Sequence, residues 1–532
     1  MLKSIYTVNR HLPYFGQLIL LVCLLAFTSC GSNNEGGSAE EVTVSGRITF
    51  DRVPVTTNGL DYENIAIEPV KRSLIAIVES NNSIIKTSYT DDSGNFSFTI
   101  SSKSSVKIQV FSETQNPQII VQDNFTVDPN DASKQAIYVL ESNTFDATGN
   151  STITKDLHAS SGYNTITNEL SEPRAAAPFA ILNTCLKAAD FFSSKRTINY
   201  PKLTINWSEK QAGSNWDGVE LNLYGIEDDD TDEYDEHVVV HEWGHYFENT
   251  LGRSDSPGGD HTDGDVLDPR IAFSEGWGNA LSAMVLFPDS VYKDTAGPKQ
   301  KKLFFEVDID ENNYELKDTY VLKDNSNFKI GWFSENTVQS ILYDLFDPAS
   351  SDTEESFDTV EADAGVIYDI FTNDIKDAES LTTIFAYING FNQRVSGADL
   401  NALLALHNMN PVVDEFGTNQ TNDGGIDGGL PVYNDLAFGA SVTLTFDSSA
   451  ASNQLGSIKY VKFSNLSGKG SISIIGGGNK TVQLIHKGAV LDSQISSTTV
   501  NINNIEFDSS KTYILTIGTS RTSSAVVSLT EN

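Results

Sequence analysis

The chain has 532 residues, and its 35 Lys and Arg against 72 Asp and Glu give a formal charge of −37. This charge argues against nucleic acid as a partner, because phosphate backbones are bound by clustered Lys and Arg. With 39% hydrophobic residues the chain can bury cores, and at roughly 100–200 residues per domain its length predicts about three or four domains. The three cysteines are too few for a disulfide framework or a thiolate zinc site.

The N-terminus has the pattern of an export signal. Two basic residues precede an apolar run over 17–27, which is shorter than the roughly 20 residues of a resident membrane helix. Two small residues directly before Cys30 resemble the processing site of bacterial lipoproteins, which implies that residues 1–29 are a signal peptide and that Cys30 carries lipid. We therefore expect a membrane-anchored protein outside the cytoplasm, in the outer membrane or at the cell surface. An ordinary secretory signal is the alternative, because Phe27 stands where a smaller aliphatic residue is preferred.

After a tether over 30–41, residues 42–142 alternate between apolar and polar side chains in short segments separated by turn clusters. This pattern predicts a small antiparallel β-sandwich. The strings VTVSGRITF and TDDSGNFSFTI resemble the carboxypeptidase regulatory-like domain that accompanies many secreted enzymes. The Ser-, Thr- and Asn-rich segment that follows, 143–177, predicts a linker.

Residues 178–411 are mostly helical by their hydrophobic periodicity, with two strands before the longest helical region. Cys185 falls on the apolar face of the first helix, so we expect a buried structural thiol. In residues 227–236, eight of ten side chains are carboxylates. We expect that this acidic block does not pack and forms either a solvated loop or a cation site.

A Gly-rich segment over 412–436 predicts a second linker, and alternating strands return over 437–532. This C-terminal region predicts a second antiparallel β-sandwich. In strand rhythm and position it resembles the prepeptidase-type C-terminal domain of secreted bacterial peptidases.

The stretch His241-Glu242-Trp243-Gly244-His245 carries the clearest chemical signal. On a helix, His241 and His245 lie one turn apart, so both imidazoles can reach one metal ion, and Glu242 can address a water on that metal. With only eight histidines in the chain, an accidental H-E-x-x-H is improbable, on the order of 0.01.

A catalytic zinc needs a third protein ligand and one open position. Glu275, at the start of a further predicted helix and 30 residues after His245, is the preferred candidate. His261 and Asp265, in the loop GGDHTDGD, are the alternatives. A histidine six residues after His245 is absent, because position 251 is Leu.

H-E-x-x-H followed by this glutamate resembles the gluzincin class of zinc metallopeptidases. The resemblance implies one Zn²⁺ held by His241, His245 and Glu275, with Glu242 as the catalytic base. Many members carry an Asp four residues after the glutamate, where it orients the first histidine. Here Asn279 holds that position and could accept the same hydrogen bond without the charge. The expected fold is a multidomain chain with a central α+β zincin-like catalytic domain flanked by the two β-sandwiches.

Other polar residues leave alternatives open. His261 could donate to a developing oxyanion or be an ordinary surface histidine, and His237, one turn before His241, could line the cleft or satisfy the core. The acidic block and the GGDHTDGD loop could bind Ca²⁺, because hard cations prefer clustered oxygen ligands, although neither has EF-hand spacing.

We expect an extracellular zinc peptidase that hydrolyses proteins or glycoproteins, with endopeptidase activity preferred because no motif for capturing a free substrate amine is found. We expect a monomer by default. The alternative is a surface binding or structural lipoprotein with a non-catalytic zinc site. The glutamate between the two histidines favours the enzyme, because a structural site does not need it.

Overall fold

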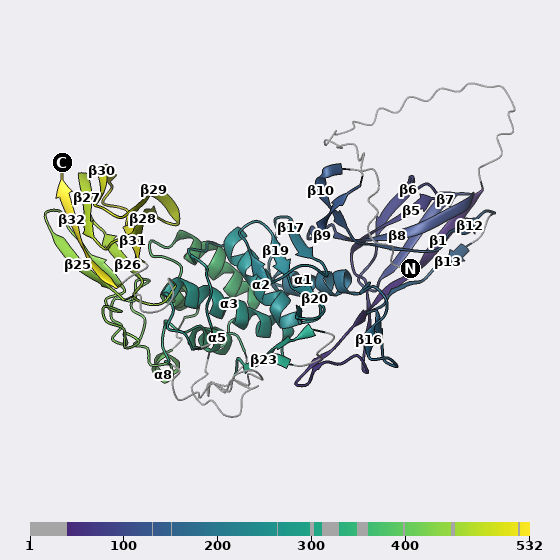
Figure 1. Ribbon diagram of the computed structural model, residues 1–532, viewed down its shortest axis with the longest axis horizontal. Helices are drawn as coiled ribbons and strands as arrows, with labels where there is room; N and C mark the ends of the chain where they lie inside the picture. Colours follow the sequence, from purple (N-terminus) through teal and green to yellow (C-terminus); the bar gives the residue numbers. More distant parts are fainter. Residues whose placement is uncertain are drawn as a thin grey trace, which may run out of the picture. The chain divides into compact units, whose positions relative to one another are not determined.

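The computed structural model (Figure 1) describes residues 40–129, 131–149, 152–262, 264–297, 303–310, 329–347, 360–396, 400–447, 453–519 and 522–532. The predicted signal peptide and the lipidation site Cys30 lie outside the described residues and stay predictions. Among the helices of the described part, none combines the length and apolar character needed to cross a bilayer.

The chain is multidomain and β-rich, with sandwich-like sheets, and divides into two compact units. Among the described residues, the first unit comprises 40–54, 62–183 and 204–211. The second comprises 55–61, 184–203 and 212–532, so it contains both the helical region and the C-terminal sheets. The short hairpin of β2 (Val55–Thr56) and β3 (Gly59–Leu60) belongs to the second unit although its neighbours in sequence belong to the first.

The first unit is built on the long strand β1 (Glu41–Arg52), which pairs antiparallel with β7 (Asn95–Ser101) and β4 (Ala66–Pro69). Strict alternation buries every second residue of β7, as its sequence predicts. The second sheet runs β17–β9–β8–β5–β6, with β10, β11 and β12 paired to β8 or β9. Their bounds are β5 Ser73–Glu79, β6 Ile84–Tyr89, β8 Lys103–Thr114, β9 Ile119–Asp128, β10 Asp131–Ile137, β11 Val139–Glu141, β12 Phe145–Ala147 and β17 Leu203–Trp207.

The segment 143–177 differs from the predicted linker. Besides β12, it contains β13 (Thr152–Thr154) and β14 (Leu157–Ala159), which pair in parallel with β1, and the hairpin of β15 (Tyr163–Asn164) and β16 (Glu169–Leu170). Strand pairing uses main-chain N–H and C=O groups. A Ser- and Thr-rich segment can therefore complete a sheet although its side chains do not predict a strand.

Helices dominate the central part of the second unit. Helix α3 packs against both α2 and α5 (Figure 1). A Cβ atom on Gly244 of α2 would lie 3.3 Å from the Cα of Gly278 on α3, so these glycines allow the two helices to approach closely. The helices are α1 Ala177–Ser193, which begins in the first unit, α2 Glu236–Thr250, α3 Pro269–Leu286, α5 Glu335–Asp344, α6 Ala364–Asp369, the π-helix η2 Ile370–Ile375, α7 Ile384–Arg394 and α8 Asn401–Leu406.

The second unit also contains short strands, some of which pack against the helices. β22 contacts both α2 and α3, and β18 and β19 contact α2. The short strands of this region have the bounds β18 Asn215–Trp216, β19 Leu221–Leu223, β20 Gly225–Ile226, β21 Asp230–Thr231, β22 Val291–Thr295 and β23 Leu303–Asp308. Cys185 is fully buried on α1, and burial raises its thiol pKa above its usual range, which fits a structural thiol.

The expectation that the acidic block cannot pack is wrong. Asp232, Glu233 and Asp235 are at most 3% exposed. Asp235 begins α2, and its carboxylate accepts hydrogen bonds from the Thr295 amide at 2.8 Å and from the Thr295 hydroxyl. The block packs because short strands and the helix start supply main-chain and hydroxyl partners, which a charge count does not reveal.

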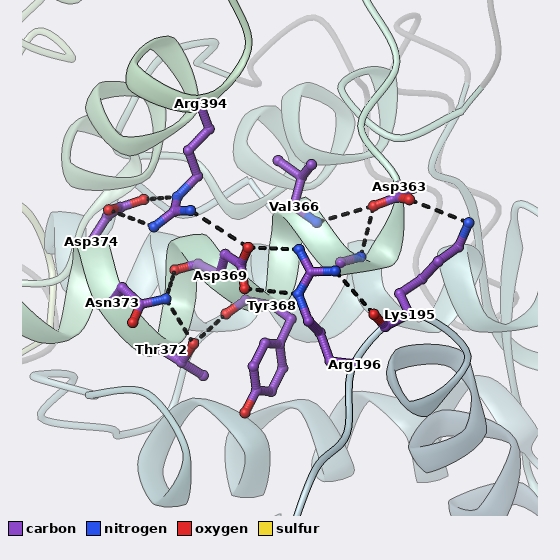
Figure 2. A network of polar contacts seen from close by, with 11 residues as sticks. Lys195, Arg196, Asp363, Val366, Tyr368, Asp369, Thr372, Asn373, Asp374 and Arg394 are labelled. Atoms are coloured by element: carbon purple, nitrogen blue, oxygen red, sulfur yellow. Dashed lines mark hydrogen bonds and ion pairs between the residues drawn. The ribbon is translucent and has the colours of Figure 1, made fainter.

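An ion-pair network joins the segment after α1 to α6, η2 and α7 (Figure 2). Arg196 donates to both oxygens of Asp369, at 3.0 and 2.6 Å. Arg394 lies 3.5 Å from Asp369 and also donates to Asp374 at 3.0 Å. Lys195 pairs with Asp363, which caps α6. Three basic and three acidic side chains thus balance one another.

The C-terminal part forms two packed sheets around an apolar core, in the orders β24–β26–β31–β28–β29 and β25–β32–β27–β30. The first strand, β24, lies inside the segment 412–436, which the sequence predicts as a linker. The composition of the segment does not predict this strand, because its pairing with β26 depends on main-chain groups alone. The bounds are β24 Tyr433–Asp435, β25 Ser441–Phe446, β26 Ile458–Phe463, β27 Gly468–Gly476, β28 Lys480–His486, β29 Ala489–Ser496, β30 Val500–Phe507, β31 Tyr513–Thr519 and β32 Ser523–Glu531.

Candidate metal centre

Helix α2 carries the two histidines of the sequence motif on one face. The Nε2 atoms of His241 and His245 are 3.0 Å apart, as one-turn spacing predicts. The preceding residues Val238, Val239 and Val240 are buried and hold the helix against its neighbours. Both imidazoles are partly buried, with side-chain exposures of 12% and 15%.

Glu275 comes to the same point from α3. Its Oε2 atom lies 3.3 Å from Nε2 of both His241 and His245, and the three side chains form a group able to hold one metal ion. Helix α3 starts with Pro269 after Asp268, whose carboxylate accepts the Arg270 amide. The structure therefore brings together the three residues that the sequence proposes as ligands.

The electrostatics of this group favour a cation. Burial alone would raise the pKa of Glu275, but the charge of His245 and hydrogen bonds from His241 and His245 hold it well below its usual value. Burial alone would lower the pKa of His245, but Glu275 and neighbouring carboxylates raise it to about 9. The site thus favours positive charge, and a bound metal would displace the proton.

Each histidine has a partner behind it. Asn279 Oδ1 accepts from His241 Nδ1 at 2.7 Å, and the amide of Asn279 donates to Gln339 at 2.8 Å, which fixes its orientation. Ser274 lies 3.2 Å from His245 Nδ1 and donates to Glu248 at 2.7 Å, so its oxygen is left to accept from the imidazole. Such partners fix the tautomer of a metal-binding histidine.

Sequence reasoning missed Ser274, Glu248 and Gln339. Glu248 is fully buried and follows His245 by three residues, so its position on the helix face was a usable signal. Burial raises the pKa of Glu248 to about 7. Gln339 lies on α5, and only the packing of α5 on α3 brings it to Asn279.

Glu242 is 7% exposed and lies next to the ligand group. Burial raises its pKa, while the histidine charges and a hydrogen bond from the Trp216 main chain oppose the shift. Among the described residues its Oε2 atom has no hydrogen-bond partner. This oxygen is therefore available to take a proton.

A cleft of about 940 Å³ opens beside the ligand group. Its lining includes Glu242, His245 and Glu275, the edge strand β18 with Trp216, and His261. An edge strand at a cleft is a place where an extended peptide can add to a sheet.

The alternative ligands occupy different positions. His261 is 28% exposed, and its Nε2 atom lies 3.6 Å from Glu275 and 3.4 Å from Glu335, so it faces the site. Glu335, the first residue of α5, was not foreseen. Asp265 instead accepts the Thr262 amide at 2.9 Å and is not part of the three-residue group.

His237 lies one turn before His241 and is 5% exposed. Its Nδ1 atom is 2.9 Å from the Ser282 hydroxyl, and its Nε2 atom is 3.9 Å from Asp289. Burial lowers its pKa. These contacts are those of a packed histidine, and it stands outside the ligand group. The remaining histidines, His158, His407 and His486, are not part of that group either.

The profile of the Mycolysin C-terminal domain matches residues 187–389, a range that includes the H-E-x-x-H motif and Glu275. No curated protein matches the chain.

Two solved structures are similar to parts of this chain. The precursor of protealysin, a metalloproteinase from Serratia proteamaculans, is 12% identical over 42% of this chain and 74% of its own, with a TM-score of 0.26. The prepeptidase C-terminal domain of a Bacillus anthracis collagenase is 14% identical over 18% of this chain and 93% of its own, with a TM-score of 0.15. The family match and the geometry of the three side chains together support a metallopeptidase-related architecture with a candidate metal centre.

Proposed function

We propose that the protein is a zinc-dependent peptidase, with the hydrolysis of peptide bonds in extracellular proteins or glycoproteins as its reaction. The observation that carries this proposal is the convergence of His241, His245 and Glu275 beside the free oxygen of Glu242, at an open cleft. The match to the Mycolysin C-terminal domain over the same residues supports it.

The donor set fits zinc. Two imidazole nitrogens and one carboxylate oxygen are the ligands of many catalytic zinc sites, which keep a further position open. When bound, zinc acts as a Lewis acid on the substrate carbonyl and lowers the pKa of water toward neutrality.

The chain's own residues supply the remaining chemistry. Glu242 takes the proton of the attacking water at Oε2 and later delivers it to the leaving amine. Asn279 and Ser274 hold the two imidazoles in the tautomer whose Nε2 atom is free to bind. We assign to His261, which faces Glu275 across the cleft, a hydrogen bond to the oxyanion of the transition state.

The cleft favours an endopeptidase. Edge strand β18 can pair with an extended segment of substrate. The sequence contains no recognised motif for capturing a free substrate amine. Anchoring through Cys30 would keep this activity at the cell envelope.

The test is the isosteric substitution Glu242→Gln in the full mature chain. We expect peptide cleavage to fall by about 10²–10⁴-fold, because the base is lost, while the zinc content stays at that of the wild type. Glu209→Gln, an exposed glutamate outside the cleft, is the matched control and should keep full activity.

Cleavage sites in a peptide library and the zinc content are measured on the same preparations. A Glu242→Gln protein that cleaves at the wild-type rate would refute the mechanism. A zinc-loaded wild type that cleaves no peptide would favour a binding lipoprotein with a non-catalytic site.

A further inference from the structure

A second group of possible metal ligands lies just before the helix that carries the histidines. Asp230 belongs to β21, Asp232 follows this strand directly, and Asp294 comes from β22. The ligand oxygens of the three carboxylates lie within 4.8 Å of one another. We propose that Asp230, Asp232 and Asp294 bind a Ca²⁺ ion, separate from the zinc centre.

Each of these carboxylates has an oxygen without a hydrogen-bond partner among the described residues. Among the described residues, the Oδ1 atoms of Asp230, Asp232 and Asp294 are buried and make no hydrogen bond. Asp232 is only 3% exposed, and its other oxygen accepts the Ser214 hydroxyl. An unsatisfied buried carboxylate oxygen is costly, so three of them at one point indicate a missing ligand.

The described residues supply no countercharge to the three carboxylates. No ion pair of the described residues gives any of the three a basic partner. Asp232 is buried, as are the unpartnered oxygens of Asp230 and Asp294, so little water screens the repulsion among the three carboxylates. A divalent cation would remove this repulsion.

The ligand chemistry favours calcium. All three candidates are carboxylates, whereas zinc prefers nitrogen and sulfur. Calcium takes six to eight oxygens in flexible geometry. Thr231, fully buried between two of the ligands in sequence, has a hydroxyl without a partner among the described residues and adds a neutral oxygen to the same segment.

The position gives the ion a structural effect. Asp294 is followed by Thr295, whose amide and hydroxyl bind Asp235 at the start of α2. A cation between β21 and β22 would therefore stabilise the segment from which the histidine helix begins. The site does not depend on hydrolysis, so it can be tested separately from the proposed function.

The experiment uses the full mature chain, loaded with zinc and freed of calcium over a chelating resin. CaCl₂ is titrated by calorimetry, and thermal unfolding is followed at 0 and 5 mM CaCl₂. We expect a Kd of about 10⁻⁴–10⁻³ M, as in other extracellular calcium sites, and a rise in Tm of a few degrees.

Asp232→Asn and Asp294→Asn should each weaken calcium binding at least about tenfold and abolish the shift in Tm. Asp228→Asn removes the same charge from an exposed position of the same segment and should keep both. Glu242→Gln should also keep both, which separates this proposal from the peptidase mechanism. A wild type without calcium binding, variants that respond like the wild type, or an equal response to MgCl₂ would overturn the assignment.

Discussion

Two clusters of carboxylates in the second unit differ in whether basic side chains lie beside them. In the network of Figure 2, Asp363, Asp369 and Asp374 face three basic side chains within 3.5 Å. In the acidic cluster, Asp230, Asp232 and Asp294 face one another and have no basic partner among the described ion pairs. The chain supplies the positive charge in one region, whereas for the other we propose a cation from solution.

The side chains of the two clusters also differ in their exposure to solvent. The side chains of Arg196 and Asp369 are 37% and 25% exposed, so water and salt weaken their attraction. Asp232 is almost completely buried, so water screens its charge poorly. Removing one charged side chain should therefore change the free energy of unfolding in opposite directions in the two regions.

The largest contrast is expected for Asp294→Asn in calcium-free buffer. Removing one of three repelling charges should raise the free energy of unfolding by about 2 kcal/mol, because the amide can also donate to an unpaired oxygen of its neighbours. Urea unfolding of the variant and the wild type at pH 7 measures this difference. A lower stability than the wild type would show that the cluster is already satisfied without calcium.

The opposite change in the free energy of unfolding, a decrease, is expected for Arg196→Met. The substitution leaves Asp369 with only the longer contact to Arg394 and should lower the free energy of unfolding by about 1 kcal/mol. The loss should shrink in 0.5 M NaCl, where the screening length is about 4 Å.

Lys195→Met is the matched control. Lys195 makes one exposed ion pair, so its substitution should lower the free energy of unfolding by less than Arg196→Met does. Equal losses at both positions, unchanged by salt, would mean that packing rather than charge holds this region together.

The smallest effect is expected from pH. The hydrogen bonds from Arg196 lower the pKa of Asp369 below its usual value of 3.8. A lowered pKa gives stability that is present above the usual value and is lost as the pH falls through the folded-state value. The difference in urea midpoint between wild type and Asp369→Asn should therefore narrow between pH 5 and pH 3. A difference that stays constant over this range would contradict the ion pair.

Much of the candidate zinc site could be predicted from the sequence. His241, Glu242 and His245 share one helix, so local periodicity is enough to place them together. Glu275 needed a resemblance to a known class as well, because 30 residues of chain separate it from His245. The partners Gln339 and Glu335 could not be predicted, since α5 meets α3 only in the folded chain.

The fold was predicted in part. The alternation over 42–142 and 437–532 predicted strands and the periodicity over 178–411 predicted helices, and the described residues contain both. The two predicted linkers contain strands, because sheet pairing uses main-chain groups that composition does not reveal. The predicted domain boundaries, the roles of the site residues and the anchor at Cys30 stay predictions.

The sequence by itself determined which chemical groups the protein can bring to a metal, because residue type and helical spacing are local properties. Only the tertiary structure decided which charges are paired. Asp294 lies 62 residues after Asp232, and the acidic block looks like a solvated loop until β22 packs beside it. Arg196 likewise meets Asp369 across 173 residues. Electrostatic energy depends on distance and burial in space, and neither follows from a count of charges along the chain.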